Sequence, residues 1–453
     1  MANKFVSTTG SDTNSGTIIS PYATVDKGLQ NVGLGETVYM RGGTYGAKVS
    51  NPTGITYGTQ ESERITVRPY ESEPVTFQPG SGTHIFQLRG DIAYLTLSGL
   101  VFNGTNLNAG AGQMVKIWTQ GSVDITNFIL DGCTLLNAPD HAFQIDPQSD
   151  SCTWKNNIVI NPGSNPGAEV NSNGFYLRGS NHVVEDNVVG YTFTPPTGTG
   201  CIRLGTNQSD VGNDCTNGII RRNYVYGGGI GIILGTGNDM LAYNNLVRAC
   251  LVLGIQIWGQ SGRPTDNCKV YHNTVVHPTG IAHGVRIILG GTVLGVPAIV
   301  TNSLVRNNLL HRCTTPIDVS ADTGTAVTTD NYTGTSPGFA NDGGTTIADY
   351  ILTGSPATID GGADLRSDVP TDFYGNTRDA TPDQGFYESV APSSPTIGVS
   401  SSYAVTKNIA YTLSDGVVYD EDGDVTYLDG VFSNLTTTVM VSGSPSGTLT
   451  TRS

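Results

Sequence analysis

The sequence carries little charge for its length, and it contains no long apolar run. Only 13% of its 453 residues are charged, and acidic residues outnumber basic ones enough to give a formal net charge of -15. This charge repels phosphate on average, which argues against nucleic acid and anionic membrane surfaces as partners. No stretch approaches the roughly 18 apolar residues of a membrane span, so we expect no membrane insertion.

The beginning of the chain lacks the apolar segment of a secretory signal peptide. The residues from Met1 to Val6 lead directly into a segment rich in Gly, Ser and Thr. Glycine alone contributes 59 residues, and a Thr, Ser, Asn and Gly surface is typical of secreted and virion proteins. We therefore expect an extracellular or virion-surface location, with no signal peptide in this chain.

Cysteine is scarce, and its spacing fits neither metal nor redox motifs. The seven cysteines form no CxxC pair and show no metal-finger spacing. Those that occupy matching places in the repeat described next do not fall in neighbouring units. We therefore expect buried thiols rather than disulfides.

One short phrase, Asn followed by apolar residues, returns through the middle of the chain. Its asparagines are Asn157, Asn187, Asn223, Asn245, Asn273 and Asn308, with separations of 30, 36, 22, 28 and 35 residues. A period of roughly 20 to 50 residues indicates stacked supersecondary units. Short alternating segments such as 254–259, broken by Gly, Asn, Asp and Thr, exclude helical repeats and fit one coil of a parallel β-helix.

The repeated asparagine is expected to stand at a tight corner of each coil. In stacked coils its side-chain amide can hydrogen-bond to the next coil and form a ladder. Gly132 and Gly99 take the same place in earlier units, which suits a backbone that tolerates a left-handed turn. This ladder is structural, and we assign it no catalytic role.

The predicted fold class is all-β, a right-handed parallel β-helix. Residues 1–390 form this solenoid, including an N-terminal cap with a short helix between Tyr22 and Val32, where apolar residues have helical spacing. Residues 391–397 are rich in Pro and Ser and read as a linker. Residues 398–453 are predicted to form a small β module.

Several motifs occur in a fixed order at the two ends of the predicted solenoid. They are Gly10-Ser11-Asp12, Gly35-Glu36-Thr37-Val38-Tyr39, Gly43-Thr44-Tyr45, Ile65-Thr66-Val67, Asp372-Phe373-Tyr374-Gly375-Asn376-Thr377-Arg378 and Gly385-Phe386-Tyr387-Glu388. In these segments the sequence resembles the right-handed β-helix polysaccharide lyases, the superfamily of pectate lyases, alginate lyases and chondroitinase B. The resemblance implies the architecture and a polysaccharide partner. Phage tailspikes share such coils, and that analogy implies a homotrimer.

One strand of each predicted coil carries polar or aromatic residues between apolar ones. Because side chains alternate across a strand, these residues should face outward on one sheet. They are Lys116, Trp118, Gln144, Asp146, Tyr176, Arg178, Arg203, Ile233, Gln256, Trp258, Arg286 and Ile288.

This stripe is the main functional signal in the sequence. It holds two of the three tryptophans and four basic residues in a chain of strongly negative charge. Flat aromatics beside cationic donors suit a polyanionic glycan. We therefore predict Lys116, Trp118, Gln144, Asp146, Gln256, Trp258 and Arg286 to bind substrate. The alternative is that exposed Arg and Trp side chains merely cover the sheet and pair with local Asp.

Cleavage of a uronate polymer by β-elimination needs a group that neutralises the carboxylate and a base that removes the adjacent proton. Arg178 and Arg203, on neighbouring coils, are candidates for the first role. Tyr176, His141, Lys116 or an arginine is a candidate for the second, since the lyases that the chain resembles use Lys or Arg. No segment matches the metal and base motif of the chondroitinase-like enzymes.

Two other functions fit the same residues. A glycoside hydrolase would use Asp140 and Asp146 as acid and base. A non-catalytic β-helix fibre or receptor-binding protein of a virion or cell surface would only bind the glycan. Separately, Asp420, Asp422 and Asp424 lie in an acidic loop that could bind Ca²⁺, although a solvated turn is the simpler interpretation.

Overall fold

The structure is a computed structural model, and it describes residues 3–108, 112–119, 124–164, 171–205, 215–260, 264–277, 283–289, 298–320, 322, 324–354, 356–389, 418–419 and 425–427. The chain divides into two compact units, Met1–Pro395 and Thr396–Ser453. The predicted linker at 391–397 lies outside the described residues, so its boundaries stay a prediction.

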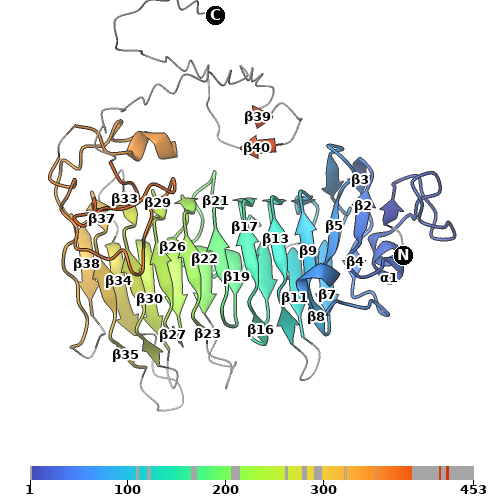
Figure 1. The fold of residues 1–453 in the computed structure, drawn as a ribbon, viewed down its shortest axis with the longest axis horizontal. Helices are drawn as coiled ribbons and strands as arrows, with labels where there is room; N and C mark the ends of the chain where they lie inside the picture. The colour runs from blue at the N-terminus through green and yellow to red at the C-terminus, as the bar shows by residue number, and fades with distance from the viewer. Residues whose placement is uncertain are drawn as a thin grey trace, which may run out of the picture. The chain divides into compact units, whose positions relative to one another are not determined.

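The first unit is built from three long, all-parallel sheets whose strands stack coil upon coil (Figure 1). Sheet 1 contains β1 (Lys4–Val6), β2 (Thr37–Met40), β5 (Ile65–Pro69), β9 (Leu95–Ser98), β13 (Ile129–Asp131), β17 (Thr153–Lys155), β20 (Val183–Glu185), β24 (Ile219–Arg221), β28 (Leu241–Tyr243), β32 (Lys269–Tyr271) and β36 (Leu304–Arg306). Sheet 2 contains β3 (Gly43–Tyr45), β6 (Val75–Phe77), β10 (Val101–Asn103), β14 (Thr134–Leu136), β18 (Ile158–Ile160), β21 (Val188–Gly190), β25 (Tyr224–Tyr226), β29 (Leu246–Arg248), β33 (Thr274–Val276) and β37 (Leu309–His311).

Sheet 3 closes each coil and carries the predicted stripe. It contains β4 (Val49–Ser50), β7 (Phe86–Arg89), β11 (Val115–Trp118), β15 (Phe143–Ile145), β19 (Asn173–Leu177), β22 (Gly200–Gly205), β26 (Ile230–Gly235), β30 (Leu253–Gly259), β34 (His283–Leu289) and β38 (Thr315–Val319). Two short parallel sheets follow it in the coil. One contains β8 (Ile92–Ala93), β12 (Ile125–Thr126) and β16 (Ser149–Asp150); the other contains β23 (Cys215–Thr216), β27 (Gly237–Asn238), β31 (Thr265–Asp266) and β35 (Val300–Thr301).

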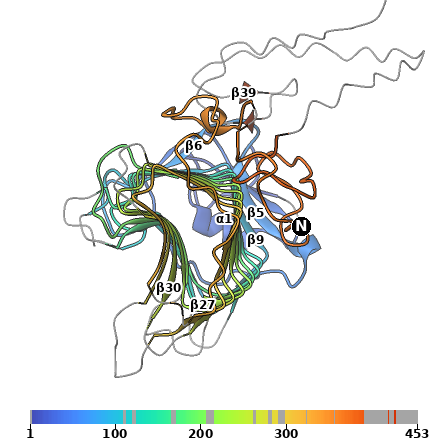
Figure 2. The ribbon, with the colours of Figure 1, turned by 90° about the vertical axis from the view of Figure 1, so that its left-hand side faces the viewer.

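This arrangement is a right-handed parallel β-helix, which confirms the predicted fold class. Seen along the stack, the successive coils superimpose (Figure 2). The coils superimpose because every second residue of each strand points inward, so that successive coils share one continuous core. Phe143 and Ile145 of β15, for example, are fully buried on either side of Gln144. Core aromatics stack between coils, as Phe77 and Phe102 do with ring centroids 5.5 Å apart.

The asparagine ladder is confirmed, and it is one residue longer than predicted. Each side-chain Nδ2 donates to the Oδ1 of the next asparagine, at 2.9 Å from Asn157 to Asn187 and 3.0 Å from Asn273 to Asn308. The last rung runs from Asn308 to Asn331, also at 2.9 Å. The sequence repeat did not reveal Asn331, because no strand with the same apolar pattern follows it.

The predicted place of the glycines in this ladder was wrong by one residue. Gly132 matches Asn156, and both have a left-handed backbone, with φ of 61° and 56°. Cys133, not Gly132, occupies the ladder position, and its backbone N donates to Asn157 Oδ1 at 2.9 Å. The left-handed turn and the amide ladder are therefore adjacent features of one corner.

The N-terminal cap contains α1 (Val25–Asn31), which is shorter than the predicted segment. Thr24 caps it by accepting a hydrogen bond from Lys27 N at 3.2 Å. Gly28 lets the helix approach β2, since a Cβ there would lie 2.7 Å from Val38 Cγ1. The cap thus covers the open end of the core, as a solenoid requires.

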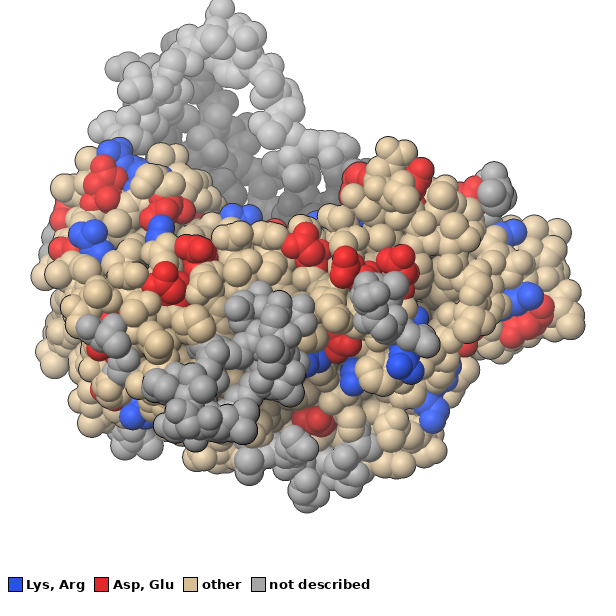
Figure 3. Space-filling model, turned by 90° about the horizontal axis from the view of Figure 1, so that it is seen from below, with Lys and Arg blue, Asp and Glu red and all other residues tan. Residues whose placement is uncertain are grey.

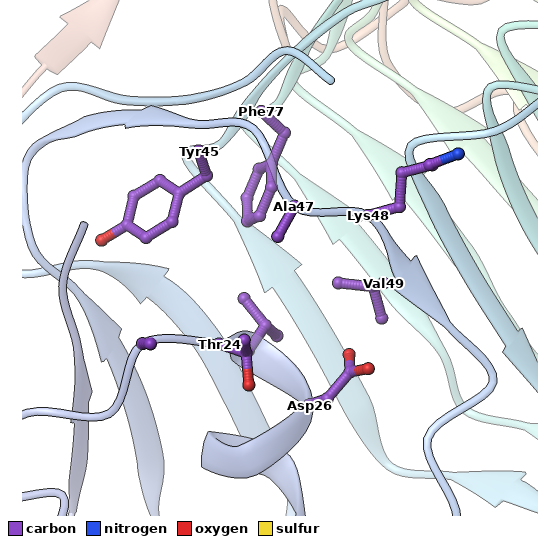
Figure 4. Close-up of a pocket in the computed structure, with 9 residues that line it drawn as sticks. Thr24, Asp26, Tyr45, Ala47, Lys48, Val49 and Phe77 are labelled. Carbon is purple, nitrogen blue, oxygen red and sulfur yellow. The ribbon is translucent and has the colours of Figure 1, made fainter. Parts of the chain in front are cut away.

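A small cavity lies beside this helix (Figure 4). Val49, Phe77 and Tyr45 line it together with the carboxylate-bearing Asp26. Asp26 Oδ1 is buried and has no hydrogen-bond partner among the described residues. Burial, and then the negative charge of Asp12, raise the pKa of Asp26 to about 6. The cap therefore contains a carboxyl group that is protonated more readily than usual.

The last part of the first unit runs back along the outside of the later coils. This closing segment comprises residues 337–354 and 356–389, is drawn in orange in Figure 2, and contains the short helix η2 (Ile347–Tyr350). A shorter turn of this type, η1 (Glu61–Glu63), lies near the N-terminus. Asn244 Nδ2 donates to Thr371 O at 2.6 Å, and Tyr350 and Phe386 pack against Leu246.

The closing motif of residues 372–378 and 385–388 is structural. Arg378 is fully buried, and its Nη1 lies 2.8 Å from Glu388 Oε2. Asp372 accepts the backbone N–H groups of Tyr374, Asn376 and Glu388 at 2.8 to 3.0 Å. The motif residues therefore fix a turn and fasten it to the coils.

Little of the second unit falls among the described residues. Its β39 (Val418–Tyr419) and β40 (Val425–Tyr427) pair antiparallel. Asp420, Asp422 and Asp424 lie outside the described residues, so the calcium loop stays a prediction.

All seven cysteines are free thiols, six of them buried. Within the described part of the chain, no helix is long and apolar enough to cross a membrane.

Candidate functional site

The outward residues of sheet 3 form two rows in register. The first row takes one residue from each coil: Gln87, Lys116, Gln144, Tyr176, Arg203, Ile233, Gln256, Arg286 and Asp318. Adjacent coils of a parallel sheet lie about 4.8 Å apart, so the row is a continuous track. The structure thus brings together residues that are up to about 230 positions apart in the sequence.

The second row lies two residues further along each strand. It contains Arg89, Trp118, Gly205, Gly235, Trp258 and Ile288, and Arg178 and Asp146 follow the ends of β19 and β15 at the same level. Gly205 cannot be replaced without displacement, since a Cβ there would lie 2.0 Å from Gly235 O. A Cβ on Gly235 would make ordinary van der Waals contact with Trp258 Cε3, at 3.4 Å.

Three residues form a cationic and aromatic cluster at the N-terminal end of the rows. Lys116 Nζ lies 4.1 Å from the ring centroid of Trp118. Arg89, on the preceding coil, places its Cζ 4.8 Å from the same centroid. Trp118 Nε1 is buried without a hydrogen-bond partner among the described residues. Such cation–π contacts hold the charges in place without neutralising them.

A second cluster lies in the middle of the rows. The guanidinium of Arg203 lies 4.7 Å from the ring centroid of Tyr176 and 5.0 Å from that of Trp258. Arg178 approaches the same tyrosine ring at 5.2 Å. Although they face outward, Tyr176, Arg178 and Arg203 are each more than nine-tenths buried. The two arginines therefore lie close together where water is largely excluded, so their electrostatic attraction for an anion is stronger than in bulk water.

Asp146 partly balances this positive charge. Its Oδ1 lies 2.7 Å from Arg178 Nη2, and its Oδ2 accepts the backbone N–H of Thr119 at 3.1 Å. Arg178 Nε also donates to Ile145 O at 3.1 Å. Arg178 is consequently held in one orientation and shares its charge with Asp146.

His141 packs against the tyrosine of this cluster. Its ring centroid lies 4.9 Å from that of Tyr176, and its Nδ1 accepts the backbone N–H of Asn173 at 2.8 Å. Burial, and then the neighbouring cations Arg203, Arg178 and Lys116, lower the pKa of His141 to about 3. The imidazole is therefore neutral, and because Nδ1 is an acceptor, its proton is carried on Nε2.

Two ionisable groups next to the rows have shifted pKa values. Burial lowers the pKa of Lys116, and Arg178 adds to this effect while Asp146 and Asp140 oppose it. Burial raises the pKa of Asp140, although Ser172 Oγ donates to its Oδ1 at 2.8 Å. An ammonium that loses its proton more easily and a carboxyl that keeps its proton longer are both suited to acid–base chemistry.

The C-terminal end of the rows is neutralised. Arg286 Nε lies 2.9 Å from Asp318 Oδ2, and His283 Nδ1 lies 3.7 Å from the same oxygen. Gln256, on the coil before Arg286, is partly exposed. This end therefore offers hydrogen bonds rather than a net positive charge.

Sequence reasoning missed Arg89 and Gln87, which continue both rows by one coil. Their strand, Phe86–Arg89, has the same alternation, so the periodic pattern could have revealed them. It also missed the glycine pair, because nothing in the sequence shows that Gly205 and Gly235 are neighbours. Among the described residues, no group of three His, Cys, Asp or Glu side chains is arranged to hold a metal ion.

The space-filling view gives the surface context. In Figure 3, several Lys and Arg side chains lie close together in the lower part of the face, on the half nearer the N-terminus. Acidic side chains are spread over the rest of that face. The formal charge of -15 therefore coexists with a local concentration of cations.

Comparisons with known proteins define the class to which this architecture belongs. No protein-family model matches the sequence, and no curated protein matches it significantly. XylC in complex with xylose superimposes with a TM-score of 0.52, at 10% identity, over 73% of this chain and 75% of that one. Pectate lyase Pel9A superimposes with a TM-score of 0.51, at 14% identity, over 86% of this chain and 97% of that one.

At such low sequence identity, these matches concern the fold alone. They confirm, at the level of the fold, the resemblance to right-handed β-helix polysaccharide lyases that the terminal motifs indicated. The function must come from the site, because one fold supports many activities.

Proposed function

We propose that this chain binds an extended acidic polysaccharide along the outer face of sheet 3 and cleaves it by β-elimination. The observation that carries the proposal is the register of Lys116, Tyr176 and Arg203 in the first row, with Trp118 and Trp258 of the second row against Lys116 and Arg203. A polymer lying along the coils would meet cationic and aromatic groups at successive sugar units. The fold shared with pectate lyase Pel9A supports a polysaccharide as the ligand.

The middle cluster suits the carboxylate of the sugar that reacts. Arg203 faces the track between two aromatic rings, whereas Arg178 shares its charge with Asp146. A guanidinium bound to the carboxylate stabilises the carbanion-like charge that develops there and so acidifies the adjacent C5 proton. Both guanidiniums contact the Tyr176 ring, so Arg203 and Arg178 are assigned the neutralising role together.

The base then removes the C5 proton. The C5–H and C4–O bonds break, a C4=C5 double bond forms, and the leaving oxygen takes up a proton. Tyr176 is the better placed candidate, because it lies on the coil next to Arg203, whereas Lys116 lies three coils from Arg203. Lys116, whose pKa is lowered by burial, is the second candidate. His141 is better suited to supporting the Tyr176 ring, since its acceptor nitrogen is already occupied by Asn173.

The direct test is an ultraviolet assay for unsaturated uronates on alginate, polygalacturonate and chondroitin, with and without calcium. We expect activity on at least one polymer, and a loss of about 100-fold or more on removal of the base. Lys116→Gln and Tyr176→Phe decide between the two bases. If Lys116 acts, the rate should rise with pH through a pKa below 10.5, and this rise should persist in Tyr176→Phe.

Binding provides the complementary test. Arg203→Glu should weaken polyuronate binding steeply, whereas Arg366→Glu, which removes an exposed arginine on the closing segment, should change it little. Unchanged affinity in Arg203→Glu would mean that the glycan binds elsewhere. Binding without any cleavage would instead favour the non-catalytic fibre.

Hydrolysis is the second candidate reaction, and one observation favours it. Asp140 has a raised pKa while Asp146 pairs with Arg178, so the two carboxyls stand in different environments, as an acid and a base require. New reducing ends without an unsaturated product would identify this reaction. Asp140→Asn would then abolish activity.

A further inference from the structure

Gln144 occupies the centre of the first row but lacks a hydrogen bond that its position demands. It lies on β15, in register with Lys116 on one side and Tyr176 on the other. Its side chain is 7% exposed, and its Oε1 is buried without a partner among the described residues. A buried carbonyl left unpaired costs about 1 to 3 kcal/mol, so such a group needs an explanation.

The amide of Gln144 points to the ligand track rather than the core. Phe143 and Ile145, its neighbours in the strand, are fully buried on the inner face. The alternation of a strand therefore directs Gln144 to the outer face, between the two cationic and aromatic clusters. An unpaired acceptor at this place is available to a donor that arrives with the ligand.

A second unpaired group lies diagonally across from it. Trp118 follows Lys116 by two residues, and Trp118 Nε1 is buried without a partner within the described ranges. Diagonal neighbours on adjacent strands are within reach of long side chains. Gln144 thus supplies an acceptor, Trp118 a donor and Lys116 a positive charge within two neighbouring coils.

We propose that Gln144 and Trp118 form a sugar subsite that selects an acidic residue with a free ring hydroxyl. The hydroxyl donates to Gln144 Oε1, a ring or carboxylate oxygen accepts from Trp118 Nε1–H, and the carboxylate faces Lys116. This inference rests on the proposed binding of an acidic polysaccharide, and it narrows the substrate to uronates that are unsubstituted at this hydroxyl. An O-acetyl group has no proton to donate, so it leaves the Gln144 carbonyl unpaired.

The test compares two oligouronates of equal length, one unsubstituted and one O-acetylated on its ring hydroxyls, by calorimetric titration. The wild-type chain should bind the unsubstituted one about tenfold more tightly, as expected for one buried hydrogen bond. Gln144→Met keeps the length of the side chain but removes the amide, and it should bind the two oligomers within about twofold of each other. Gln144→Leu serves as a second variant.

The control is Gln78→Leu, a partly exposed residue directly after β6 of sheet 2, which should keep the preference of the wild type. Equal binding of the two oligomers by the wild type, or an undiminished preference in both Gln144 variants, would overturn the subsite while leaving the proposed function intact. Failure of every oligouronate to bind the wild type would overturn the proposed function, and the subsite with it.

Discussion

The guanidinium of Arg203 lies 5.0 Å from the ring centroid of Trp258, although a whole coil separates their strands. This contact spans the intervening strand β26 because that strand offers Gly235 at the level of the indole. A Cβ on Gly235 would make ordinary van der Waals contact with Trp258 Cε3, at 3.4 Å, so the indole lies beside the backbone of β26 at this point. The cation–π contact with Trp258 holds the arginine beside the track.

The first prediction concerns this contact. Trp258→Ala should reduce polyuronate affinity about fivefold, because a partly desolvated cation–π contact contributes on the order of 1 kcal/mol. Trp258→Phe keeps an aromatic ring and should recover part of the loss. Titrations at constant ionic strength would measure both. Equal affinities for the Phe and Ala variants would show that stacking does not position Arg203.

The second prediction concerns the asparagine ladder. Asn223→Ala should lower the free energy of unfolding by about 3 kcal/mol, because it leaves several buried groups unpaired. Asn223 Oδ1 accepts from both Asn187 N and Nδ2, and its own Nδ2 donates to Val184 O. Urea unfolding would measure the change. The exposed Asn31→Ala in α1 should cost less than about 0.5 kcal/mol, and a comparable loss there would contradict this account.

The third prediction concerns the buried ion pair of the closing segment. Arg378→Met should destabilise the protein by about 3 to 5 kcal/mol, since it leaves the Glu388 carboxylate buried without its partner. Burial raises the pKa of Glu388 and lowers that of Arg378, so it opposes the charged form of both. The charge of each partner offsets this effect of burial on the other. Hydrogen exchange should show faster opening of residues 356–389 in the variant.

Arg366→Met is the matched control for this third prediction. Arg366 pairs with Asp364 at 2.7 Å, but both side chains are largely exposed, so their contact is screened by water. The control should leave both the unfolding midpoint and the exchange rates nearly unchanged. An equal effect of the two substitutions would mean that burial does not decide the cost.

The fourth prediction concerns the pH dependence of the N-terminal cap. The pKa of Asp26 is about 6 in the folded chain and 3.8 for the unperturbed group, so folding favours the protonated form. The stability that this carboxyl contributes is complete below about pH 4 and is lost as the pH rises through 6.

Asp26→Asn should therefore stabilise the protein at pH 8 and leave it almost unchanged at pH 4. The gain should be on the order of 1 kcal/mol, because Asp26 is only partly buried and water screens its charge. Urea unfolding at the two pH values would measure it. A variant that gains the same stability at both pH values would show that the charge is not the cause.

Much of the fold could be predicted from local sequence signals. The interval between Asn157 and Asn308 revealed the coils, and the alternation around Gln144 identified the outer face of sheet 3. These signals are local because a solenoid residue contacts mainly the neighbouring coils. The glycine slot was misplaced because both Gly132 and Asn156 tolerate left-handed backbones, and sequence alone does not distinguish the turn from the adjacent ladder.

The site was less predictable than the fold. Lys116, Tyr176 and Arg203 were identified as outward residues, but their environments were not. The sequence does not show that Arg178 is paired with Asp146, that His141 accepts a backbone N–H, or that Arg286 is neutralised by Asp318. Each of these contacts joins residues from adjacent coils, and the register in which the coils stack determines which residues meet.

The sequence by itself determined the β-helix, the position of its corners and the face on which Lys116 and Trp258 lie, because strand alternation and a repeated asparagine are encoded residue by residue. Only the tertiary structure decided which charges remain available to a ligand and which polar atoms, such as Gln144 Oε1, are left unpaired. Burial and distance across coils control those properties, and both arise only when the coils stack.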